Sequence, residues 1–211
     1  MNLHRAQKLP DWKLEPPESL NYFQKIAEAT NGILTPGNLV TSVGLYLVYK
    51  GAQDLNNDKI LSGTLKIGFG RLMDYFDGLL AHITRTKSFV GEAFDATTDK
   101  TTLVLVGSPL YKKNLIPRNK LDLVFAQNAI NVAYTMKAKN EGKEIHPSKY
   151  GKLATAAQWI FIGSSLLEKA AKDANFHTTG NILNKISNVS FLSFLGLGSI
   201  ASAKIIQDSN K

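Results

Sequence analysis

The sequence predicts an all-α fold. Apolar residues recur at helical spacing in one segment after another, and short breaks rich in Pro, Gly and Asn separate these segments. Of the 211 residues, 44% are hydrophobic and 20% are charged, which excludes a disordered chain and leaves enough apolar material for a packed core. The chain has no cysteine, which excludes a disulfide scaffold, a thiolate zinc site and a cysteine nucleophile.

The first predicted element is an amphipathic N-terminal helix. The run Pro16–Ser19 is typical of a helix start, and the helix is expected to end near Asn31. Residues 1–17 are polar and contain no apolar stretch of a secretory signal peptide. A surface helix on a core and a helix in a membrane interface fit this pattern equally well. The apolar residues that share one face are Leu20, Phe23, Ile26 and Ala27.

Six longer helices follow, and no internal repeat or linker divides the chain. A turn at 35–38 precedes the first of them, and polar segments at 53–59, 112–120 and 137–150 are expected to be loops. The helices are predicted at about 38–50, 60–85, 91–111, 121–136, 151–171 and 182–206.

Hydropathy and charge leave the cellular setting open. The mean hydropathy of −0.11 is typical of a soluble protein. Residues 186–203 nevertheless form an uncharged run of about 18 residues, just long enough to cross a membrane. The net charge of +8 favours an anionic partner, such as nucleic acid, anionic lipid or a phosphorylated substrate.

Two polar stripes lie on consecutive predicted helices between positions 74 and 99. The members of the first stripe are spaced i, i+3, i+4 and i+7, and those of the second i, i+4 and i+8, so each stripe shares one helix face. A basic turn with Arg85 and Lys87 joins the two helices. The stripes are Asp74, Asp77, Gly78 and Ala81, and then Gly91, Asp95 and Asp99.

Antiparallel packing of these helices would bring the four carboxylates together, with Gly78, Ala81 and Gly91 allowing a close approach of the backbones. Four uncompensated negative charges cannot share a desolvated site, and no cluster of arginines is placed to neutralise them. Divalent cations that prefer hard oxygen ligands, Mg²⁺ or Mn²⁺ as a pair, are the natural counter-ions.

A solvated acidic face is the alternative explanation, and it is the commoner one for any two aspartates. Asp is a poor helix former, and a glycine inside a helix costs about 1 kcal/mol relative to alanine. Several such residues at fixed offsets in adjacent helices therefore favour a functional site.

The two stripes together resemble the motif of the CDP-alcohol phosphatidyltransferase family, D-x2-D-G-x2-A-R-x8-G-x3-D-x3-D. In this chain the motif reads Asp74-x2-Asp77-Gly78-x2-Ala81-His82-x8-Gly91-x3-Asp95-x3-Asp99, with His82 in place of the arginine. Two flanking patterns fit the same family. Asn38-x2-Thr41 resembles the start of its first membrane helix, and Gly151-Lys152-x2-Thr155-x2-Gln158 resembles phosphatidylglycerophosphate-synthase-like members.

The resemblance implies a polytopic membrane protein with six transmembrane helices, usually a homodimer, whose active site opens to the cytoplasm. Residues 1–37 would then form an N-terminal interfacial segment and residues 38–206 the membrane domain. The charge pattern supports the orientation modestly. Arg85, Lys87 and the 137–152 segment share one side, while four basic residues between 112 and 120 lie on the other. The implied spans are 38–52, 60–82, 91–111, 120–137, 151–171 and 182–205.

The implied reaction transfers a phosphatidyl group from CDP-diacylglycerol to an alcohol and releases CMP. The resemblance assigns Asp74, Asp77, Asp95 and Asp99 to Mg²⁺ or Mn²⁺, and Asp99 also to the role of general base. Arg85 would supply part of the charge missing at His82 if the helix continues that far. The cytidine and diphosphate site would be lined by Asp74, Gly78, Ala81, His82 and Gly91, with Thr41 from the first helix.

The acceptor follows less directly from the sequence. The Gly151–Gln158 pattern favours glycerol 3-phosphate. However, glycerophosphate-using members often carry an Arg-Glu pair in the fourth helix, where this chain has Gln127-Asn128. Lys137, Lys139 and Lys152 are the residues that would supply the positive charge for the acceptor phosphate instead. Inositol phosphate, phosphatidylglycerol or another polar alcohol, and a non-catalytic member of the fold, remain alternatives.

A nucleic-acid binder is the competing class, with Lys137–Lys152 as the segment that contacts phosphates. That hypothesis leaves the four aspartates unexplained. The expected partners are therefore CDP-diacylglycerol, an alcohol or phospho-alcohol acceptor and membrane lipids, and no nucleic acid.

Overall fold

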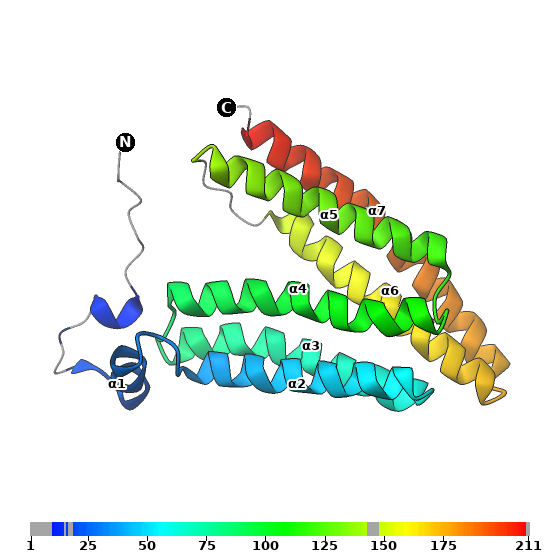
Figure 1. The fold of residues 1–211 in the computed structure, drawn as a ribbon, viewed down its shortest axis with the longest axis horizontal. Coiled ribbons are helices and arrows are strands. Elements are labelled where there is room, and N and C mark those ends of the chain that lie inside the picture. Colours follow the sequence, from blue (N-terminus) through cyan, green and yellow to red (C-terminus); the bar gives the residue numbers. More distant parts are fainter. Residues whose placement is uncertain (1–9, 15, 17–18, 143–147, 210–211) are drawn as a thin grey trace. The chain divides into compact units, whose positions relative to one another are not determined.

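The computed structural model describes residues 10–14, 16, 19–142 and 148–209, and within them it is all helical, as predicted. A short 3₁₀ helix, η1, precedes seven α-helices, and no strand occurs in this described part of the chain (Figure 1). The elements are η1 (Asp11–Lys13), α1 (Tyr22–Ala29), α2 (Pro36–Asn56), α3 (Ile60–Ile83), α4 (Phe89–Lys112), α5 (Arg118–Asn140), α6 (Lys149–Asp173) and α7 (His177–Ser209).

Helix α1 begins later than the sequence predicts. Asn21 is its N-cap: the Asn21 side chain accepts a hydrogen bond from the Gln24 backbone, and the Gln24 side chain accepts one from the Asn21 backbone, both at 2.9 Å. Ser19 closes a separate turn, in which its backbone N–H donates to the Pro16 carbonyl at 2.9 Å, so the predicted start precedes α1 by a few residues. Pro17 and Glu18 lie outside the described residues. Leu20 and Ala27 are buried as expected, but Phe23 is exposed.

The other helix ends differ from the predictions by a few residues, for local reasons. Helix α2 begins at Pro36 because the Thr35 side chain caps it and proline suits the first helical position, so the predicted turn is in fact the helix start. It continues to Asn56, beyond the predicted end at residue 50. Helix α5 continues to Asn140, so the loop predicted to begin at residue 137 is shorter.

Two compact units make up the chain. The first comprises residues 1–57 and 65–108, and so contains α1, α2, most of α3 and most of α4. Its three long helices run side by side (Figure 1). Where α2 meets α3 the backbones come very close: a Cβ built on Gly70 would lie 2.6 Å from the Gly44 carbonyl oxygen. This contact positions one side of the helix that carries Asp74 and Asp77.

The second unit comprises residues 58–64 and 109–211, and α7 packs against both α5 and α6 in it. Its core contains the fully buried Phe161 and Leu166, and the rings of Phe161 and Phe191 lie 5.0 Å apart. Among the described helices, only α7 is both long enough and apolar enough by composition to cross a membrane. The six predicted spans coincide with helices α2 to α7, but their insertion in a membrane stays a prediction.

Candidate metal and nucleotide site

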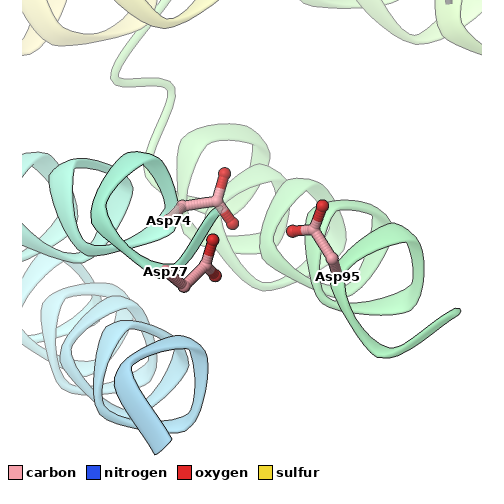
Figure 2. A group of neighbouring side chains, drawn as sticks. All are labelled: Asp74, Asp77 and Asp95. Carbon is pink, nitrogen blue, oxygen red and sulfur yellow. The ribbon is translucent and has the colours of Figure 1, made fainter. Parts of the chain in front are cut away.

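Three of the four motif aspartates come together in the first unit. Asp74 and Asp77 lie one turn apart on α3 and project toward Asp95 on α4 (Figure 2). Each of the three offers a carboxylate oxygen, and these oxygens all lie within 4.8 Å of one another. The helical spacing in the sequence thus predicted a real convergence of carboxylates.

Asp77 is held in place from α2. The Thr41 hydroxyl donates a hydrogen bond to Asp77 Oδ2, and both side chains are buried. Thr41 was expected at the nucleotide site on the strength of the family resemblance, and the structure brings it into contact with the acidic group. Its side chain thereby fixes which oxygen of Asp77 remains available for a ligand.

The fourth aspartate, Asp99, is not one of the three that converge, but it is joined to Asp74 through an arginine. Arg71, one turn before Asp74 on α3, places its NH2 nitrogen 2.9 Å from Asp74 Oδ2 and 2.7 Å from Asp99 Oδ1. Arg71 is not among the site residues predicted from the sequence, because only a cluster of arginines was expected to neutralise the carboxylates. The signal was nevertheless present, since Arg71 precedes Asp74 by three residues and so shares its helix face.

The small residues of the motif do not act as predicted. A Cβ built on Gly78 would meet nothing within 4 Å, so Gly78 does not bring α3 and α4 together. Ala81 instead faces α2, where its Cβ would lie 3.4 Å from a Cβ on Gly37. Gly91 lies near Asn38, also on α2. The close approach in this unit is therefore between α2 and α3, whereas Gly78 leaves open space.

The turn between α3 and α4 is tied to the N-terminal segment. Asn21 donates to the Thr84 carbonyl at 3.2 Å and Gln24 to the Arg85 carbonyl at 3.5 Å. Helix α3 ends at Ile83, and Arg85 adopts a left-handed backbone conformation with φ 52°. Arg85 therefore does not lie one helical turn beyond His82, as proposed for it to replace the missing arginine charge. His82 itself is exposed in the last turn of α3.

The residues considered for the acceptor phosphate lie in the second unit. Gln127 donates to Ser202 on α7 at 2.9 Å, and Asn128 donates to Gln158 on α6 at 2.8 Å. Both amides thus join helices, and neither carries a charge. Lys137 and Lys152 lie near the ends of α5 and α6, while the side chain of Lys139 lies outside the described residues.

The carboxylate group suits a divalent cation with a preference for oxygen ligands. Beyond the convergence of oxygens, Asp74 Oδ1 is buried and has no hydrogen-bond partner among the described residues. A buried carboxylate oxygen without a donor is costly unless a cation neutralises it. Together with the carboxylates of Asp77, which Thr41 orients, and of the exposed Asp95, that of Asp74 forms a donor set typical of Mg²⁺ or Mn²⁺.

Comparison with known proteins agrees with this chemistry. A family model described as CDP-alcohol phosphatidyltransferase matches residues 33–194, a range that contains the whole acidic motif and most of helices α2 to α7. Searches of curated proteins and of solved structures find no match. Members of this family are enzymes that transfer a phosphatidyl group from a CDP-linked alcohol to an alcohol acceptor. Because the match covers most of the chain, the protein belongs to the CDP-alcohol phosphatidyltransferase family.

Proposed function

We propose that this protein transfers the phosphatidyl group of CDP-diacylglycerol to a small polar alcohol and releases CMP. The observation that carries the proposal is the convergence of Asp74, Asp77 and Asp95 within a chain that belongs to the family. In the reaction a bond forms between the acceptor oxygen and the phosphorus of the phosphatidyl group. The bond from that phosphorus to the oxygen of CMP breaks, and the acceptor's proton must be removed.

The three aspartates would hold Mg²⁺ or Mn²⁺. A divalent cation bound there would neutralise the diphosphate and the negative charge that develops on the departing CMP. The chain's own part is to orient the ligands: Thr41 fixes Asp77, and Arg71 fixes Asp74. Gly78, exposed and without neighbours on its open side, leaves room for the nucleotide to approach the α3 backbone.

Asp99 is the proposed acceptor of the alcohol's proton. Its side chain is 43% exposed, against 18% for Asp74, so an acceptor hydroxyl can reach it from solvent. Because Asp99 lies one helical turn beyond Asp95 on α4, the base would lie beside the metal ligands.

The proposal includes insertion in a membrane, which the properties of two helices support. Helix α7 passes the test of length and hydropathy. Helix α3 has 24 residues, about 36 Å, and exposes a continuous apolar stripe along its whole length, which suits a hydrocarbon core of about 30 Å. We extend the proposal to six spans, α2 to α7, a homodimer, an interfacial N-terminal segment and a site open to the cytoplasm. The exposed stripe of α3 consists of Leu61, Leu65, Phe69, Leu72, Phe76, Leu79 and Ile83.

Glycerol 3-phosphate is the first acceptor to test, because the Gly151–Gln158 pattern resembles that branch. A second candidate is supported by the structure. The amides of Gln127 and Asn128 are engaged between helices and carry no charge, which favours an acceptor without a terminal phosphate, such as phosphatidylglycerol or another polyol.

The test is CMP release from CDP-diacylglycerol by the full chain in detergent with Mg²⁺ or Mn²⁺, across a panel of these acceptors. We expect release that depends on both the acceptor and the metal, and that is absent in Asp95→Asn. A chain that binds CDP-diacylglycerol but releases no CMP with any acceptor would be a non-catalytic member and would refute the proposal. The exposed control Asp58→Asn, whose partner Lys113 lies in the second unit, should retain activity.

A further inference from the structure

Arg71 links the fourth motif carboxylate to the three that converge. Asp74, Asp77 and Asp95 form the converging group, while Asp99 lies outside it and pairs with the guanidinium. The same NH2 nitrogen contacts Asp74, so Arg71 joins helix α3 to helix α4 at the edge of the converging group. Its side chain is only 14% exposed, so its pair with Asp74 is largely shielded from solvent, whereas Asp99 is 43% exposed.

The Arg71 guanidinium places a positive charge beside Asp99, as a bound metal cation would. It is permanently charged, and its donors suit carboxylate oxygens. Four carboxylates close together repel one another, and Arg71 offsets part of that repulsion at the two aspartates it contacts. A divalent cation placed on Asp99 would have to use the oxygen that Arg71 now holds, or share the carboxylate with a second positive charge. Both arrangements weaken cation binding there.

We propose that Arg71 is a built-in competitor for the second divalent cation of this site. The first cation would be held by Asp74, Asp77 and Asp95, and the guanidinium would compete with a second cation for Asp99. The two cations therefore bind with unequal affinity. Arg71 is a positioning residue, which keeps Asp99 directed toward the site while the second position is empty. The inference rests on the proposed metal site and concerns how that site fills.

The experiment is a titration of the purified full chain in detergent micelles with Mn²⁺ alone, followed by the EPR signal of unbound Mn²⁺. The wild-type protein should show one tighter and one weaker site. Arg71→Gln should tighten the weaker site by about tenfold, a typical size for coupling between neighbouring ligands. Arg71→Lys, which keeps the charge but loses the planar fork, should tighten it by a smaller factor. Asp99→Asn in the Arg71→Gln background should abolish the weaker site.

Arg118→Gln is the matched control, because it removes one positive charge from an exposed arginine outside the first unit. It should leave both Mn²⁺ constants unchanged. If Arg71→Gln leaves the weaker constant unchanged, or if the two wild-type sites have equal affinity, the inference is wrong while the proposed function stands. If the wild-type chain binds no Mn²⁺ and releases no CMP, both are wrong.

A folding defect is detected independently, by elution of each variant as a monodisperse protein. If Arg71→Gln does not elute in this way, Arg71→Lys decides the question. A tighter weaker site in Arg71→Lys supports the competition, and an unchanged constant overturns it.

Discussion

The two sides of helix α3 differ: one packs closely against α2, and the other carries charged side chains toward α4. Toward α2 the backbones nearly touch, since a Cβ on Gly70 would clash with the Gly44 carbonyl oxygen and with Val48. Toward α4 the helix presents Asp74 and Asp77, and Arg71 reaches across to Asp99. The first side secures the position of the helix by packing, whereas the second holds charges that would repel without a counter-ion. Substitutions on the two sides should therefore have opposite consequences for stability and for activity.

The largest effect is expected on the charged side. Asp95→Asn should lower CMP release by about a hundredfold or more, because it removes a ligand from the electrostatic centre of the reaction. The apparent melting temperature in detergent should stay the same or rise, since one of several like charges is lost. Asp74→Asn should behave in the same way. Wild-type turnover in either variant would contradict the assignment of these side chains to a cation.

On the packed side the expected effect is on stability. Gly70→Ala should destabilise the protein by about 1–3 kcal/mol, because the new Cβ lies 2.6 Å from backbone and cannot be accommodated without a shift of the helices. Gly68→Ala is the matched control, since its Cβ would meet nothing within 4 Å. Thermal unfolding of the two variants measures the difference, and equal melting temperatures would show that α2 and α3 do not pack this closely.

At Gly78 the effect of a substitution on stability can be separated from its effect on activity. Gly78→Ala adds a methyl group in open space, so it should not lower the melting temperature and should gain helix propensity of about 1 kcal/mol. We expect CMP release to fall by about tenfold nonetheless, because the methyl group occupies space that the proposed nucleotide site uses. The Gly68→Ala protein provides the baseline for activity as well. Full activity in Gly78→Ala would remove Gly78 from the nucleotide site.

His82 should give the smallest effect. Its side chain is exposed and makes no hydrogen bond or ion pair with the described residues, so His82→Arg should change CMP release by at most about fivefold, as expected of an exposed charge. Arginine offers a planar fork of donors with a permanent charge, which histidine lacks. Identical CMP release by His82→Arg and the wild-type protein would make His82 a spectator.

The features that could be predicted from the sequence are those that depend on spacing within a helix, and not those that depend on how two helices pack. The helices and the convergence of Asp74, Asp77 and Asp95 follow from periodicity within one or two segments, and all were predicted. Helix ends were less accurate, because the caps at Asn21 and Thr35 depend on a few local hydrogen bonds. Such bonds compete with other turn conformations that suit the same residues.

The packed side of α3 could not be predicted, because it depends on the register between two helices. Gly44 and Gly70 lie 26 positions apart, and no local pattern reports that they face each other. The motif glycine Gly78 was given that packing role instead, wrongly. Arg71 was within reach of sequence reasoning, since its spacing from Asp74 is helical, but its contact with Asp99 requires the relative placement of α3 and α4.

Removal of metal is the sharpest test of a catalytic cation at Asp74, Asp77 and Asp95. The full chain is treated with EDTA and then supplied with Mg²⁺ or Mn²⁺, while CMP release from CDP-diacylglycerol is followed. If Asp74, Asp77 and Asp95 hold a catalytic cation, release should stop in EDTA and return with the metal, and Asp95→Asn should not recover. CMP release that continues undiminished in EDTA would contradict the account.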